Sequence, residues 1–117
     1  MKSKVFKNGN YVWECKTSPT PKSLGASVEV FYLKAEIAAV KRRWAKEGMP
    51  SGYYYVFPVN YISNAARQEL ENFKSQYRGQ VDIGYYDCDQ VQKLIENSVK
   101  IGSMQDLISY IQQARKN

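Results

Sequence analysis

The sequence predicts an α/β fold in which a mixed sheet of about four strands is flanked by helices in three layers. An N-terminal pair of strand patterns flanks Asn8-Gly9, and helical and strand patterns then alternate along the chain. This alternation is typical of helices packed on a sheet that is partly parallel. At 117 residues, the chain has the length of a single domain.

The first two strands are expected at residues 3–7 and 10–16. Asn-Gly favours a two-residue hairpin turn because both residues tolerate positive φ. A turn at these two residues would place Ser3 opposite Glu14. The second strand alternates between an apolar and a polar face, made of Tyr11, Trp13 and Cys15 and of Val12, Glu14 and Lys16 respectively.

Residues 17–26 are rich in helix and strand breakers and predict a loop, which we expect to be mobile without a ligand. A helix is expected over 27–46, because apolar residues recur every three or four positions before Gly48 and Pro50. This apolar stripe comprises Val30, Leu33, Ile37, Val40 and Trp44.

The second half of the chain predicts two further strands and three further helices. Residues 53–59 form a short continuous apolar run, the pattern of a strand buried on both faces. A parallel strand is expected at 81–86, after a helix with Ser63 as N-cap and an end at Gly79. The last two helices are expected to follow capping boxes, at Asp89 with Gln92 and at Ser103 with Asp106.

The composition excludes several classes of protein. The chain has no histidine, which rules out Ser-His-Asp triads, Cys-His nucleophile pairs and histidine-ligated zinc. Two cysteines cannot build a disulfide framework, which favours a reducing, cytoplasmic location. No apolar stretch is long enough for a signal peptide or a membrane span, so no membrane partner is expected.

The net charge of +6 is unevenly distributed. Residues 1–25 carry five lysines against one glutamate, and residues 34–48 carry five cations against two acids. This positive field predicts a polyanionic partner, and we expect weak, salt-sensitive binding to DNA without sequence preference. The residues expected to contact nucleic acid are Lys4, Lys22, Lys41, Arg42 and Arg43.

Glu14 and Lys16 are the main candidates for chemistry. They are two residues apart on a strand, so their side chains leave the same face about 7 Å apart. A carboxylate at this position can hold a divalent cation, while the ammonium can orient a water or neutralise a phosphate. A surface charge pair is the alternative explanation of the same spacing.

The order of elements around this motif resembles the restriction-endonuclease-like superfamily with the PD-(D/E)xK motif, in particular its Mrr-like and related branches. The resemblance covers about residues 3–97, with Glu14-Cys15-Lys16 as its motif and later segments YYYVFPVN, SNAARQ and VDIGYYDCDQVQKLIE. It implies a three-layer nuclease core, Mg²⁺ as cofactor and hydrolysis of DNA phosphodiester bonds. It also implies that Glu14 and the Cys15 carbonyl bind the metal and that Lys16 assists the attacking water.

In this superfamily an aspartate on the preceding strand is a second metal ligand, yet no acid precedes Glu14 in this chain. One carboxylate and one carbonyl make a poor Mg²⁺ site. Either the chain is the C-terminal portion of a larger nuclease-like domain, or the site has degenerated. We therefore expect no Mg²⁺- or Mn²⁺-dependent nuclease activity from residues 1–117 alone.

Three functions stay open: a nuclease-like domain acting on DNA, a non-catalytic nucleic-acid-binding or interaction module on the same scaffold, and an accessory domain with incidental basicity. A homodimer is compatible with each. Glu29 begins the long helix and either approaches the site or interacts favourably with the helix dipole. The remaining candidates are Asp87, Cys88 and Asp89, as a ligand site or a helix cap, and Tyr53, Tyr54 and Tyr55, for base stacking or core packing.

Overall fold

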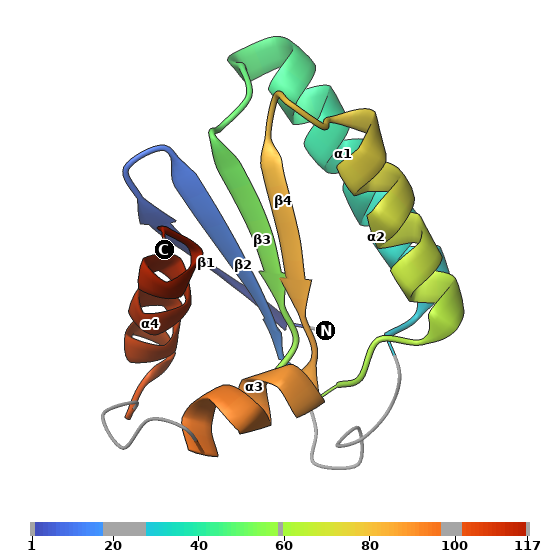
Figure 1. Cartoon of the computed structure of the whole chain (residues 1–117). Coiled ribbons are helices and arrows are strands. Elements are labelled where there is room, and N and C mark those ends of the chain that lie inside the picture. Colours follow the sequence, from blue (N-terminus) through green and yellow to red (C-terminus); the bar gives the residue numbers. More distant parts are fainter. Residues whose placement is uncertain (1, 18–27, 59, 97–101, 117) are drawn as a thin grey trace.

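The computed structural model describes residues 2–17, 28–58, 60–96 and 102–116. Its helices and strands follow the predicted order, which confirms the α/β class (Figure 1). The elements are β1 Lys2–Asn8, β2 Tyr11–Thr17, α1 Val30–Glu47, β3 Gly52–Val56, α2 Asn64–Gln76, β4 Asp82–Tyr86, α3 Cys88–Glu96 and α4 Met104–Lys116.

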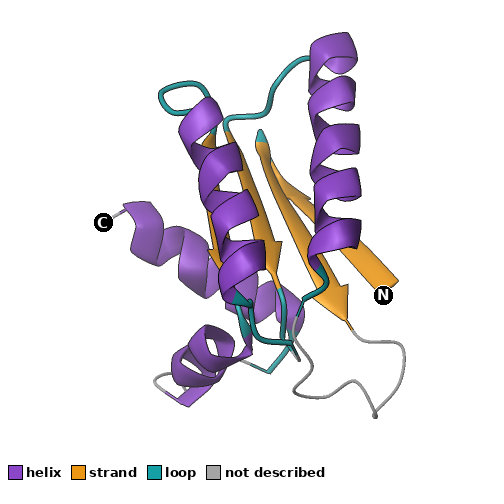
Figure 2. Cartoon of the chain, turned by 90° about the vertical axis from the view of Figure 1, so that its right-hand side faces the viewer, coloured by secondary structure: helices purple, strands orange, loops and turns teal. Residues whose placement is uncertain are grey.

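The sheet is mixed and has the order β1-β2-β3-β4. β1 is antiparallel to β2. β2 pairs in parallel with β3, and β3 pairs in parallel with β4. α1 and α2 lie side by side over one face, as Figure 2 shows, and α3 and α4 pack on the other. The predicted arrangement, a hairpin followed by parallel strands between helical layers, is therefore confirmed.

The hairpin has a different register from the predicted one. Asn8 pairs with Tyr11, so the turn residues are Gly9 and Asn10, and Gly9 has a φ of 62°. Asn10 is held to the start of β3, where its carbonyl accepts from the amide of Ser51 at 2.8 Å. The pairing is consequently shifted by two residues, a shift that preserves which side chains share a face. Glu14 lies opposite Val5, and Lys16 lies opposite Ser3.

The predicted elements shift by a few residues at their ends. The long helix α1 begins at Val30, and it ends before Gly48, which has a φ of 97°. β3 ends at Val56, shortly before Pro58, a residue that has no amide hydrogen to donate. Residues 18–27 lie outside the described residues, and with them lie the expected loop and Lys22.

Two of the predicted helix starts are confirmed by their caps. The Ser63 side chain accepts a hydrogen bond from the Ala66 amide at 3.2 Å. The Ser103 side chain likewise accepts from the Asp106 amide at 3.2 Å. Each bond satisfies one of the amides that the first helical turn leaves without an intrahelical partner.

β3, the strand predicted to be buried on both faces, contributes side chains to two separate cores. Tyr53 and Tyr55 of β3 point toward α1 and α2, whereas Tyr54 points toward α3 and α4. All three tyrosines are at most 2% exposed, so they are core residues and not a stacking surface. The predicted stripe of α1 contributes Leu33, Ile37, Val40 and Trp44 to the first core, and Val30 packs against it.

Candidate functional site

The second half of β2 places two charged side chains in the interior. Glu14 and Lys16 are each only 8% exposed, on the face covered by α1 and α2. Both share the face opposite Trp13 and Cys15, as predicted. The alternative explanation, a charge pair on the surface, is wrong, because Glu36 of α1 and Tyr53 of β3 contact this part of the strand. Cys15 points into the opposite core, as predicted.

Lys16 joins two carboxylates in this interior position. Its Nζ is 3.2 Å from Oε1 of Glu14 and 2.5 Å from Oε1 of Glu36, a residue of α1. The hydroxyl of Tyr53, on β3, donates a hydrogen bond to Oε2 of Glu14. We call Glu14, Lys16, Glu36 and Tyr53 the acid–lysine cluster. Its most accessible member is Glu36, whose side chain is 27% exposed.

The two carboxyl groups of the cluster have different acidities. Burial acts to raise the pKa of Glu14, but the Tyr53 hydrogen bond and the charge of Lys16 outweigh it and hold this pKa below the ordinary 4.5. Burial raises the pKa of Glu36 above the same value, with Lys16 acting against this rise and Glu14 adding to it. Glu36 is therefore the first of the pair to take up a proton as the pH falls.

The phenol groups beside the carboxylates stay protonated. Burial raises the pKa of Tyr53 far above its ordinary value, and the charge of Glu14 adds to the effect. The hydroxyl of Tyr55 is fully buried and has no hydrogen-bond partner among the described residues. Burial and the charges of the cluster raise its pKa as well. Both phenols thus keep their hydrogen, and Tyr53 donates its own to Glu14.

Sequence reasoning considered Glu29 and missed Glu36. Glu29 is exposed, stands at the N-cap position of α1 and makes no side-chain cap bond. Glu36 lies three residues after Leu33 and four before Val40, on the flank of the buried stripe. An acid in this position on a helix can reach the part of the sheet that the apolar stripe covers. This spacing is the sequence signal that could have identified Glu36 as a candidate. Its partner, Lys16, is identified only by the position of α1 relative to β2.

The acid–lysine cluster offers only part of the ligand set that a divalent cation needs. Among the described residues, no group of three His, Cys, Asp or Glu side chains comes close enough to hold a metal ion. Glu14 and Glu36 nevertheless converge on one point from different elements, and hard cations prefer carboxylate oxygens. Any contribution from Cys15 would be its backbone carbonyl, which lies in the sheet, since Cys15 pairs with both Lys4 and Val56.

The predicted nucleic-acid-binding residues that the structure describes do not form one surface. Arg42 and Arg43 are exposed on α1. Lys41 bonds to Gln76 of α2, and its Nζ lies 5.7 Å from the Phe73 ring.

Lys4 lies on the other side of the sheet. It pairs with Cys15 and its ammonium is 5.2 Å from the ring of Phe6, which packs against the α3/α4 core. Of the predicted contact residues that the structure describes, those on the cluster's side of the sheet are therefore the ones on α1.

The acids between β4 and α3 form a helix cap. The Gln90 amide donates to Oδ1 of Asp87 at 3.1 Å, and the Gln90 side chain accepts from the Asp87 amide at 3.0 Å. This reciprocal pair is the capping box, two residues before the predicted one, because α3 begins at Cys88. Asp87 also lies 3.7 Å from Arg67 of α2, and Asp89 is exposed.

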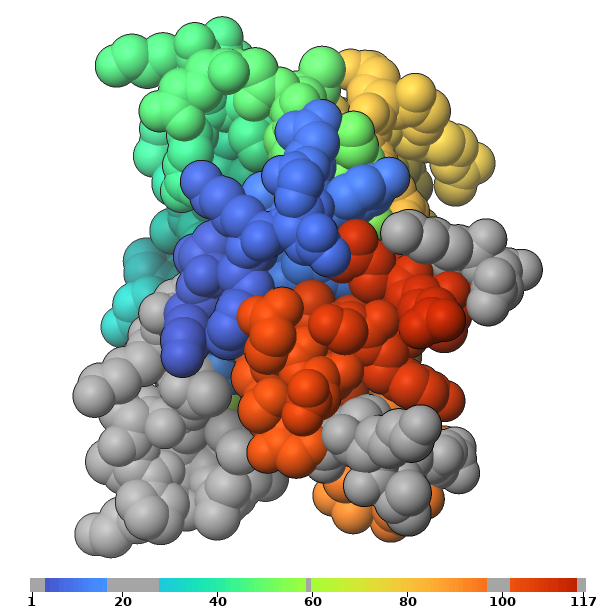
Figure 3. All heavy atoms as spheres, turned by 90° about the vertical axis from the view of Figure 1, so that its left-hand side faces the viewer, coloured from blue at the N-terminus to red at the C-terminus, as the bar shows by residue number. Residues whose placement is uncertain are grey.

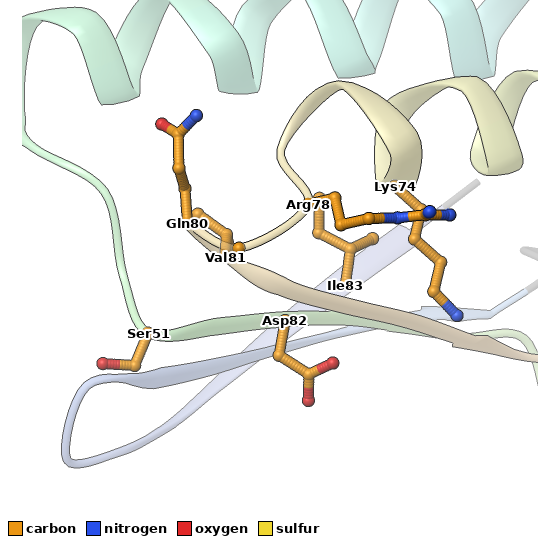
Figure 4. A pocket seen from close by; sticks show the side chains of 8 residues that line it. Ser51, Lys74, Arg78, Gln80, Val81, Asp82 and Ile83 are labelled. Carbon is orange, nitrogen blue, oxygen red and sulfur yellow. The ribbon is translucent and has the colours of Figure 1, made fainter.

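A shallow cavity of about 380 Å³ lies at the opposite end of the sheet, next to the start of β4 (Figure 4). Lys74 and Arg78 line it from the end of α2. Positive charge is favourable at a helix C-terminus, and both side chains are exposed to solvent. These two cations are thus explained by the helix, and the acid–lysine cluster is the stronger candidate site.

The chain was compared with protein-family models, curated proteins and solved structures. No family model matches, and no curated protein or solved structure matches significantly. The resemblance to restriction-endonuclease-like proteins therefore stays a prediction. In the part of the chain that the structure describes, no helix is long and apolar enough to span a membrane.

Proposed function

We propose that this chain is a nuclease-like domain that hydrolyses phosphodiester bonds in nucleic acid with a divalent metal ion. The proposal replaces the expectation that residues 1–117 alone are inactive, which was made without Glu36. The observation that carries the proposal is the convergence of Glu14 and Glu36 on the ammonium of Lys16 inside the fold. Glu14 and Lys16 are the residues that match the superfamily motif. Glu36 takes the place of the second carboxylate, so this proposal requires no upstream aspartate.

The cost of burying these charges supports a functional role. Removing ionised groups from water costs several kcal/mol each, and well-packed apolar residues are often as stabilising or more so. Yet Glu14 and Lys16 are 8% exposed beside a large apolar core that could accommodate apolar side chains. Buried acids whose pKa is shifted by burial and by a specific charge partner, as for Glu14 and Glu36, are found at functional sites.

Each residue of the cluster has a distinct role in this proposal. A divalent ion held by Glu14 and Glu36 would polarise a phosphoryl oxygen and lower the pKa of a bound water. Tyr53 fixes the orientation of Glu14 through its hydroxyl. Lys16 balances the charge of both acids and is placed to donate to a phosphate oxygen or to a water. The net charge of +6 attracts the polyanion.

The test is cleavage of single-stranded and duplex DNA and RNA with Mg²⁺ or Mn²⁺, together with calorimetric titration of Mn²⁺. Glu14→Gln, Glu36→Gln and Lys16→Met should each abolish cleavage, and the two glutamine variants should also lose Mn²⁺ binding. Glu29→Gln is the matched control, since it changes an exposed acid at the start of the same helix. Circular dichroism establishes that each variant is folded. Cleavage that survives in both glutamine variants would contradict the proposal.

A second candidate function is nucleic-acid binding without catalysis. It is favoured by the small number of ligands, because the described residues offer two carboxylates that Lys16 already pairs. This alternative predicts salt-dependent binding of nucleic acid, no cleavage and no Mn²⁺ binding. The same titrations therefore separate the two functions.

A further inference from the structure

Two aromatic side chains project into solvent from the first turn of α1. Phe31 is 76% exposed and Tyr32 is 67% exposed, the highest values for large hydrophobic residues in the described part of the chain. Their rings contact each other edge to face, with centroids 5.5 Å apart and an interplanar angle of 81°. Neither ring belongs to a core, so the fold itself does not explain them.

One of the two rings, that of Tyr32, lies on the same side of α1 as the acid–lysine cluster. Tyr32 precedes Glu36 by four residues, which places it one turn away on the same side of α1, about 6 Å along the axis. Glu36 is the most accessible member of the cluster. A third exposed aromatic, Tyr61, lies next to the start of α1, since the Val28 amide donates to its carbonyl at 3.0 Å.

We propose that Phe31 and Tyr32 form a stacking platform for unpaired bases, which makes single-stranded nucleic acid the substrate class of the site. This inference rests on the proposed function. A strand whose bases stack on the two rings would carry its backbone past Glu36, one turn further along α1. A duplex cannot use the platform in this way, because its base faces are already stacked on one another.

The surroundings of the rings favour nucleic acid over a protein partner. A protein-docking surface needs a wide contiguous apolar patch. Here Lys34 lies two residues after Tyr32 and stays 60% exposed while its Nζ is 3.6 Å from Oε1 of Glu69. The same helix carries the exposed Arg42 and Arg43. Aromatic rings combined with cations are the usual means of binding single strands, since rings stack on bases and cations contact phosphates.

The test uses a twelve-nucleotide strand containing 2-aminopurine, whose fluorescence falls when the base stacks, in EDTA so that no cleavage occurs. The full chain should quench the probe and bind it more tightly than a duplex of equal length. The double variant Phe31→Ala/Tyr32→Ala should lose the quenching and bind the strand about 10-fold more weakly or worse, as stacking energies imply. Its affinity for the duplex should not change.

Two control variants identify the ring as the cause. Tyr32→Phe keeps the aromatic face and should behave like the unmodified chain. Tyr110→Ala removes an exposed tyrosine from α4, on the other side of the sheet, and should have no effect. Circular dichroism should give the same spectrum for all variants, because the changed side chains are exposed.

Unchanged binding and quenching in the double variant would overturn the platform, even if the chain cleaves nucleic acid. Equal weakening for strand and duplex would also overturn it. Absence of metal-dependent cleavage, combined with the expected quenching results, would instead contradict the proposed hydrolysis and leave the platform intact.

Discussion

The α1/α2 face of the sheet buries charged side chains beside its apolar core, whereas the α3/α4 core is built from apolar side chains. Glu14 and Lys16 face α1, while their neighbours Trp13 and Cys15 face the other way at 1% exposure or less. Consecutive residues of one strand thus serve different purposes. The apolar face stabilises the fold, and the polar face holds a cluster whose charges are costly to bury.

The largest expected effect comes from disrupting the apolar face. Trp13→Ala should lower the free energy of unfolding by about 3–5 kcal/mol, because Trp13 is fully buried against Tyr54 and truncation leaves a cavity. Urea denaturation measures the loss. Trp13→Phe is the control and should cost clearly less, since its indole Nε1 has no partner among the described residues. Equal losses for the two variants would show that the cavity is not the cause.

Breaking the polar face should have the next largest effect. Lys16→Met leaves two carboxylates together without their cation and should cost about 3 kcal/mol in urea denaturation. The triple variant Glu14→Gln/Lys16→Met/Glu36→Gln removes all three charges and should recover most of that loss. If the triple variant is as unstable as Lys16→Met alone, the ion pairs themselves stabilise the fold.

The pH dependence of stability sharpens the same comparison. Because the pKa of Glu36 is raised in the folded chain, folding favours its protonated form, and stability is lost as the pH rises above about 4.5 toward the folded value. The stability advantage of the unmodified chain over Glu36→Gln should therefore fall as the pH rises through this range.

Glu14 should behave in the opposite way. Its folded pKa is lowered, so its contribution is present above the ordinary 4.5 and is lost as the pH falls through the folded value. The advantage over Glu14→Gln should consequently shrink on acidification. Urea denaturation at a series of pH values measures both differences. Parallel profiles for the two variants would contradict the assignment of the two acidities.

The smallest expected effect concerns the attachment of α4 to the sheet. Arg115 donates to Asp82 of β4 from Nη2, at 2.7 and 2.8 Å, and from Nε, at 3.2 Å. Its guanidinium lies 4.7 Å from the centre of the Tyr54 ring. Arg115→Lys should cost about 1 kcal/mol, because the paired geometry is lost at a partly exposed position.

Amide hydrogen exchange measures this attachment, since α4 should exchange faster in the variant while α1 is unchanged. Arg78→Lys alters another exposed arginine, outside α4, and serves as the control. Unchanged exchange in α4 would mean that its apolar contacts alone hold it on the sheet.

Most of the fold follows from local patterns in the sequence. The stripe of α1 and the caps at Ser63 and Ser103 depend on residues three or four apart, so a sequence reveals them directly. The hairpin register was missed because a long-range contact sets it. Asn10 is tied to Ser51, some forty residues away, and Asn-Gly alone also permits the other turn.

Two of the four residues of the acid–lysine cluster could be predicted, because local spacing reveals them and long-range contacts determine the other two. Glu14 and Lys16 share a strand face, which the spacing indicates. Glu36 and Tyr53 reach them from other elements, and no local pattern shows where α1 and β3 lie against β2. The burial of the cluster was missed as well, because charged side chains on a strand normally face solvent.

The helix α4 packs against the hairpin formed by β1 and β2. The Asn8 side chain donates to Gln112 at 3.0 Å across 104 positions, and α4 lies against β1 and β2 at the surface, as Figure 3 shows. At about 5–20 residues per second, a ribosome takes about 5–20 s to proceed from the end of β2 to the end of α4. For that interval the nascent hairpin has no α4 to shield its Trp13 side. Burial of the Trp13 side of the hairpin therefore has to wait for the last helix described, however early the hairpin itself can pair.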